Sequence, residues 1–131
     1  MMFWQKKLVI AGCPLTILVL FAFGRYHTLF HTTADYDVFM HFLGGGLFVI
    51  TLAGILWHLP WTNRLIRRIR PAVFKAGLLA GLLLTSIAWE ILEVVLNMTP
   101  NITQSVADTV FDIICALGGA ALALCFIRSD D

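Results

Sequence analysis

Glu90 and Glu93 lie three residues apart, one helical turn, within an otherwise apolar segment of the chain. An ionised side chain near the middle of a bilayer costs roughly 2.5–3.5 kcal/mol on insertion scales, so such residues usually face a bundle interior and have a partner or a function. Carboxylates can bind protons or cations, and they can transfer protons during catalysis. The two glutamates therefore predict a polar site inside a membrane-embedded bundle.

Two further pairs of polar residues have helical spacing. Asp37 and His41 are four residues apart, and so are Asp108 and Asp112. This spacing places both members of a pair on one face of a helix, about 6 Å apart along its axis. We therefore expect three helices to bring two polar groups each to one layer of the protein.

The residue types in this layer suit a metal ion. Carboxylates with an imidazole are typical ligands of Zn²⁺, Mn²⁺ or Fe, and oxygen-rich sets also suit Mg²⁺ or Ca²⁺. The five carboxylates of this layer outnumber its one cation, Arg25. They cannot all stay ionised in a low-dielectric pocket, so protons or bound cations must balance their charge. The candidate metal ligands are His41, Glu90, Glu93, Asp108 and Asp112; Glu90 and Asp112 are also the candidate catalytic residues, and Asp37 and Arg25 complete the polar site.

Helix capping is an alternative explanation for Asp37 and Asp108, which lie in the first turns of their predicted helices. Asp108 is the fourth residue of a capping-box pattern that begins at Ser105, and the helix dipole favours an acid at such a position. Capping does not explain Glu90 or Glu93, because the dipole disfavours negative charge near a helix C-terminus. The other members of the pairs lie one turn too deep to act as caps.

Four apolar segments must position these residues. Hydrophobic residues make up 60% of the 131-residue chain and charged residues only 13%, about half the charged share of a soluble domain. A helix needs roughly 20 residues to cross the hydrocarbon core, and the absence of strand-like alternation excludes a barrel. The sequence predicts an all-α integral membrane bundle, a single transmembrane domain over residues 1–131, with four helices at about 8–23, 36–58, 72–96 and 105–127.

The basic residues predict the orientation of this bundle. Most of them flank the same ends of the predicted helices, whereas Arg25 lies at the other end. The positive-inside rule then places both termini in the cytoplasm and the polar site near the outward face. A basic cluster in the loop after Pro60 sets this topology, and binding to anionic lipid is the alternative; the cluster consists of Arg64, Arg67, Arg68 and Arg70.

Small residues and the arrangement of basic residues add two expectations. Small residues that allow helix backbones to approach closely are Gly44-Gly45-Gly46, Gly77 and Gly81, and Gly118-Gly119. The basic residues do not alternate with aromatic residues as they do in nucleic-acid-binding proteins, so we expect membrane lipids as partners and no nucleic acid. The sequence leaves a homo-oligomer open.

The chain resembles the VanZ-like and YjdF-like group of small bacterial membrane proteins. The matching motifs are Tyr36-Asp37 with His41-Phe42, the stretch 89–93, Asp108-Thr109 with Asp112, and Gly118-Gly119. The resemblance implies a multi-pass protein of the bacterial inner membrane, linked to the cell envelope, in a group largely without assigned biochemistry. Its VanZ members are linked to tolerance of glycopeptide antibiotics such as teicoplanin. This chain carries Glu93 where the VanZ pattern often has Gln.

Two functional hypotheses remain open on the sequence alone. The first is a metal-assisted hydrolase or transferase that acts on a lipid or on a lipid-linked envelope intermediate, with the ion activating water and a carboxylate serving as general base. The second is a binding or transport protein in which the same carboxylates exchange protons or cations without catalysis. The identity of the metal, the substrate and the pathway is not determined by the sequence.

Overall fold

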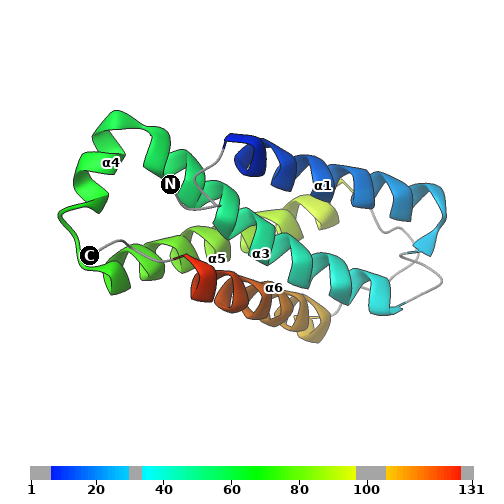
Figure 1. The fold of residues 1–131 in the computed structure, drawn as a ribbon. Helices are drawn as coiled ribbons and strands as arrows, with labels where there is room; N and C mark the ends of the chain where they lie inside the picture. Colours follow the sequence, from blue (N-terminus) through cyan, green and yellow to red (C-terminus); the bar gives the residue numbers. More distant parts are fainter. Residues whose placement is uncertain (1–6, 30–33, 97–105, 128–131) are drawn as a thin grey trace.

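The protein is a bundle of helices in the computed structural model, which describes residues 7–29, 34–96 and 106–127. Within these residues there are five helices, and four of them are long and apolar enough to cross a membrane. The predicted all-α class and the four spans are therefore confirmed, with ends that differ by a few residues. The helices are α1 (Lys7–Tyr26), α3 (Ala34–His58), α4 (Pro60–Ile66), α5 (Pro71–Val95) and α6 (Val106–Phe126) (Figure 1).

Two of the helix starts follow from proline. Pro60 opens α4 and Pro71 opens α5, each preceded by a residue in an extended conformation. Proline suits the first helical position because its missing N–H would have no helical partner there. α1 continues through Pro14 without a break in its assignment. The predicted capping residue Ser105 lies outside the described residues.

The segment after Pro60 is a short helix and not the loop that the sequence suggested. The Thr62 hydroxyl donates to the carbonyl of Leu56, and the Asn63 side-chain amide donates to the carbonyl of Trp57 at 2.7 Å. These carbonyls belong to the last turn of α3, where no further helical N–H is available. The side chains of Thr62 and Asn63 therefore satisfy carbonyls at the end of α3 and stabilise the turn of the chain into α4.

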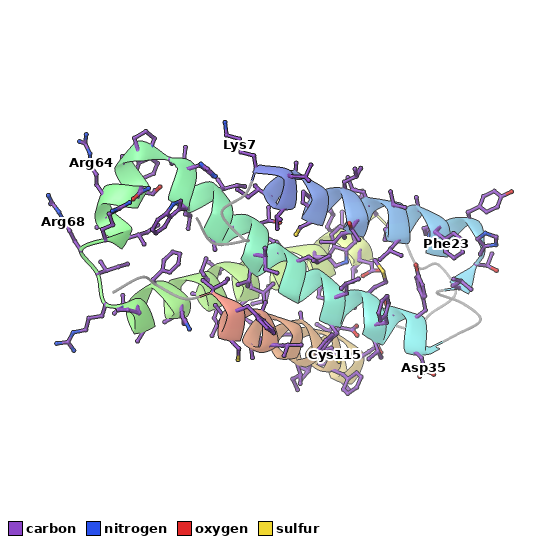
Figure 2. All side chains as sticks on the ribbon, viewed as in Figure 1. Lys7, Phe23, Asp35, Arg64, Arg68 and Cys115 are labelled. Carbon is purple, nitrogen blue, oxygen red and sulfur yellow. The ribbon has the colours of Figure 1, made fainter. Side chains whose placement is uncertain are left out.

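Charged side chains separate to the two ends of the bundle. Lys7, Arg64 and Arg68 lie at the end that carries α4, whereas Asp35 lies at the opposite end (Figure 2). The positive-inside rule predicts the orientation of a membrane protein from such a one-sided distribution of Lys and Arg. The side of the membrane that each end faces stays a prediction.

Arg67 differs from the other arginines of the basic cluster because it makes contacts within the protein. Its Nε donates to Asn63 Oδ1 at 2.8 Å, and its guanidinium lies 5.3 Å from the centre of the Trp57 ring. A guanidinium over an aromatic face gains about 0.5–1 kcal/mol at an exposed site. Arg67 therefore helps to hold α4 against the end of α3.

α3 and α6 form the closest helix pair of the bundle, and glycines make this approach possible. A Cβ atom added to Gly45 would lie 2.0 Å from the carbonyl oxygen of Ala116, and one added to Gly119 would lie 1.8 Å from that of Phe42. The expected role of small residues in close packing is confirmed here. A Cβ on Gly77 meets nothing within 4 Å, so this glycine has no such role.

An apolar core fills the half of the bundle nearer α4. Residues of α3, α5 and α6 meet there, and each is at most 8% exposed. Within a bilayer this core is stabilised by van der Waals packing, because lipid chains are as apolar as its side chains. The members of this core are Val49, Ala53, Phe74, Leu78, Leu82, Ala120, Leu124 and Ile127.

Lys75 connects α5 to the end of α6. Its Nζ donates to the carbonyl of Leu124 at 2.9 Å, and Leu124 lies in the last turn of α6, where carbonyls lack helical partners. We expect Lys75→Met to lower the free energy of unfolding by about 1.5 kcal/mol, because a charge-assisted hydrogen bond is lost. Titration with SDS in mixed micelles, followed by circular dichroism, measures this change. Lys7→Met, which removes an exposed ammonium, is the control; equal stability of the two variants would contradict the assigned role.

Candidate functional site

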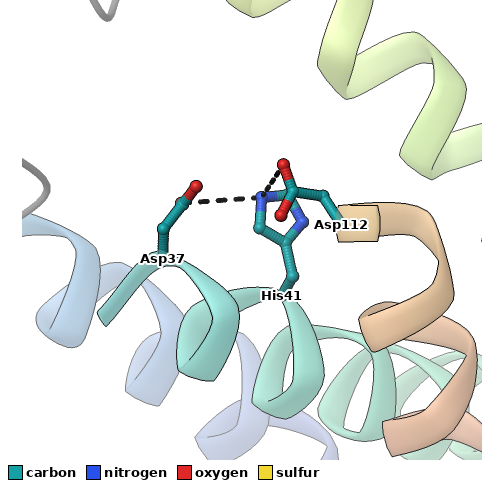
Figure 3. A group of neighbouring side chains, drawn as sticks. All are labelled: Asp37, His41 and Asp112. Carbon is teal, nitrogen blue, oxygen red and sulfur yellow. Dashed lines mark ion pairs between the residues drawn. The ribbon is translucent and has the colours of Figure 1, made fainter. Parts of the chain in front are cut away.

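His41 lies between two carboxylates that come from two helices. Its Nε2 is 3.7 Å from Oδ1 of Asp37, one turn earlier on α3, and 3.8 Å from Oδ2 of Asp112 on α6 (Figure 3). One possible ligand atom from each residue lies within 4.8 Å of the others. We call Asp37, His41 and Asp112 the triad.

The close α3–α6 packing explains why the triad forms. Gly45 follows His41 by one helical turn, and Ala116 follows Asp112 by one turn. Because the backbones touch at Gly45 and Ala116, the side chains one turn away must also face each other. Asp112 is buried, and Asp37 remains partly exposed in the first turn of α3. The first-turn position of Asp37 is thus compatible with both capping and contact with His41.

The triad has the residue types and spacing of an open metal site. Zn²⁺ binds nitrogen and oxygen at about 2.0–2.2 Å, which places neighbouring ligand atoms of a tetrahedral site roughly 3.3–3.5 Å apart. The observed separations of 3.7 and 3.8 Å are only slightly longer. Three protein ligands with a fourth position free for water or substrate are typical of catalytic zinc sites. The triad therefore has donor atoms that could hold a divalent ion.

Glu90 and Glu93 surround the triad but face different neighbours. Glu90 is buried between α5 and α6, where the Thr109 hydroxyl donates to its Oε2 at 3.1 Å. Glu93 lines a cavity that His41 also borders, and it interacts electrostatically with Asp112. Neither glutamate belongs to the group of ligand atoms within 4.8 Å. Glu90 still interacts electrostatically with Glu93, so the predicted pair stays together while each member has a different surrounding.

Asp108 and Arg25 lie at the edge of this polar region. Asp108 is half-buried in the first turn of α6 and interacts electrostatically with Asp37. Arg25 is exposed in the last turn of α1 and does not line the cavity. Of the predicted ligands, the structure therefore brings His41 and Asp112 together, adds Asp37, and leaves Asp108 and the glutamates around them.

A cavity of about 350 Å³ adjoins the triad between α1, α3 and α5. Asp37, His41 and Glu93 provide its acidic and imidazole groups, and Thr85 and Ser86 add hydroxyls. None of the described residues that line it is Lys or Arg. The remaining lining residues are Ile17, Leu18, Phe21, Met40, Gly44, Gly45, Phe48, Leu82, Trp89 and Ala116.

Aromatic side chains form part of the cavity wall. Phe21 of α1 and Trp89 of α5 meet edge to face, with ring centroids 5.9 Å apart. Neither ring is among the site residues that the sequence predicts. Trp89 directly precedes Glu90, which is the one signal the sequence contains, but its position beside Phe21 depends on how α1 packs.

One family model covers nearly the whole chain. The model, described as "Predicted membrane protein (DUF2238)", matches residues 7–129. No match was found among curated proteins or among solved structures. The family description agrees with the four membrane-competent helices, and it assigns no reaction.

Proposed function

This chain belongs to the DUF2238 family of predicted membrane proteins, and we propose that it binds a divalent cation through Asp37, His41 and Asp112 and acts on the head group of an amphiphile in the adjoining cavity. The observation that carries the proposal is the position of the triad at the polar border of an otherwise apolar cavity. The resemblance to the VanZ-like and YjdF-like group supports a place in the bacterial inner membrane and the cell envelope.

The chemistry that such a site suits is metal-assisted hydrolysis or group transfer. A divalent ion polarises a carbonyl or phosphoryl oxygen and makes bound water more acidic. Asp37, His41 and Asp112 hold the ion, and Asp37 and His41 also line the cavity. In this proposal Asp112 is a metal ligand, and Glu90 positions α6 through Thr109 instead of contacting the ligand.

The packing of the other half of the bundle favours action at one side of the membrane over transport across it. Val49, Leu78 and Ala120 belong to a core in which α3, α5 and α6 are in direct apolar contact. A transport path needs polar groups or water along its length, because a charge in an apolar interior is costly. The buried members of this core are apolar, and the Lys75 ammonium beside them donates to the carbonyl of Leu124. The alternative of proton- or cation-coupled transport therefore has less support than binding with chemistry.

Elemental analysis of the purified protein tests the proposed ion site. Protein in lipid nanodiscs is dialysed against Zn²⁺ or Mn²⁺ and then against metal-free buffer, and we expect about one ion per chain to remain. Asp112→Asn removes a buried ligand and should weaken ion binding at least about tenfold, because the loss of partners in the shell outside the ligands already weakens metal sites by 10–100-fold.

Asp35→Asn is the matched control for that measurement. It changes an exposed aspartate in the same first turn of α3 that carries Asp37, and we expect it to retain the ion. A parent protein that retains no stoichiometric ion, or an Asp112→Asn variant that binds like the parent, would refute the proposed site.

A further inference from the structure

We propose that the cavity between α1, α3 and α5 is a binding site for a lipophilic cation, whose positive charge pairs with Glu93 beside Trp89. The proposal goes beyond the divalent-ion site, because Glu93 of α5 is not a member of the triad, although Asp37 and His41 also line the cavity. The ligand is defined by its chemistry: one delocalised or quaternary positive charge attached to an apolar body.

The charge of the cavity lining selects for a cation. Asp37 and Glu93 contribute two carboxylates and His41 one imidazole, while the described lining contains no Lys or Arg. Asp112 interacts electrostatically with Glu93 from behind the cavity wall, which adds to the negative field. Among the lining residues only a protonated His41 can offer Glu93 a positive charge, and the carboxylates of Asp37 and Asp112 compete for it. Without a bound divalent ion, an anionic group would be repelled here and a cation attracted.

The aromatic and aliphatic lining suits an apolar cation rather than a hydrated one. Trp89 or Phe21 can present a ring face to the charge, and a cation over an aromatic face is attracted most strongly when it is desolvated. Leu18, Phe48 and Leu82 line the rest of the wall. A volume of about 350 Å³ lies within the usual range of small-molecule sites, about 300–1,000 Å³.

The cavity is accessible from the membrane side of the bundle. α1 packs on α3, and its described ring contact to α5 is the Phe21–Trp89 pair. Leu18 lines the cavity and is 64% exposed on the lipid-facing surface, and Trp89 is 37% exposed. A membrane-dissolved cation can therefore reach Glu93 between α1 and α5 after a small movement of these two rings.

Binding of tetraphenylphosphonium tests the proposal, with tetraphenylborate as a probe of the same shape and opposite charge. Equilibrium dialysis uses the full chain in phosphatidylcholine nanodiscs, with empty nanodiscs as background and EDTA present throughout. We expect saturable binding of tetraphenylphosphonium only. Glu93→Gln should weaken it at least about tenfold, about 1.4 kcal/mol, and Asp35→Asn should leave it within about twofold.

A second pair of variants tests the cavity without changing its charge. Gly44 lines the cavity, and a Cβ there meets nothing within 4 Å, so Gly44→Leu should fill the space and abolish binding of the probe. Gly77→Leu, on the outside of α5, is the matched control and should bind like the parent. Saturable binding of tetraphenylborate, no saturable binding of tetraphenylphosphonium, or unchanged affinity in both Glu93→Gln and Gly44→Leu would overturn the proposal. Because EDTA removes divalent ions, the result does not depend on whether the triad binds one.

Discussion

Gly119→Ala should destabilise the bundle by about 3 kcal/mol, the upper end of the usual range for overpacked positions. The new Cβ would lie 1.8 Å from the carbonyl oxygen of Phe42 and 2.8 Å from its carbonyl carbon. Both atoms belong to the backbone of α3, so no side-chain rotation can relieve the overlap, and α3 and α6 must move apart. The higher helix propensity of alanine, up to about 1 kcal/mol, offsets only part of this loss.

Titration with SDS in mixed micelles, followed by tryptophan fluorescence and circular dichroism, measures the effect of this substitution. Gly77→Ala is the matched control, because the same change of residue in α5 meets nothing within 4 Å; its stability should equal or exceed that of the parent. If Gly119→Ala unfolds at the same SDS fraction as Gly77→Ala, the close α3–α6 approach described here is wrong.

His41→Ala should abolish the stabilisation of the protein by a divalent ion. A ligand present at 100 times its dissociation constant stabilises the folded state by about 2.7 kcal/mol. Because His41 Nε2 lies within 3.8 Å of both carboxylates of the triad, its loss removes the one nitrogen ligand and leaves the two aspartates facing each other. The variant should bind the ion at least about 100-fold more weakly than the parent, an effect of about 2.7 kcal/mol.

Thermal unfolding at increasing Zn²⁺ or Mn²⁺ concentration detects this loss. The midpoint of the parent should rise with ion concentration, and that of His41→Ala should not. His58→Ala is the control, since His58 lies exposed in the last turn of the same helix, away from the triad. An ion-dependent rise of equal size in the parent and in His41→Ala would show that the triad does not hold the ion, while leaving the proposal on Glu93 unaffected.

The helices themselves could be predicted because their signals are local. Uninterrupted apolar stretches of about 20 residues specify membrane helices, and prolines such as Pro71 mark where a helix begins. The short helix α4 was not predicted, because it is held by a tertiary contact. The side chains of Thr62 and Asn63 donate hydrogen bonds to carbonyls in the last turn of α3. The sequence of this basic segment alone predicts a loop, because the carbonyls that its side chains bind are not visible in a local pattern.

The amino-acid sequence alone determined that Asp37 and His41 share a helix face, because a spacing of four residues does so in any α-helix. It also determined that the acids lie at the helix ends opposite the basic cluster. Only the tertiary structure decided which of them meet. The contact of Gly45 with Ala116 sets the rotation of α3 against α6 and brings His41 to Asp112.

The two glutamates show the same division. Their spacing predicted one shared face, yet a separation of three residues leaves them about 60° apart around the helix axis, enough for two different neighbours. Glu90 meets Thr109 on α6, and Glu93 faces the cavity beside α1. No local pattern encodes that division, because it depends on where the neighbouring helices pack around α5. The chain therefore specifies its polar groups one helix at a time, and the packing of the helices makes a site of them.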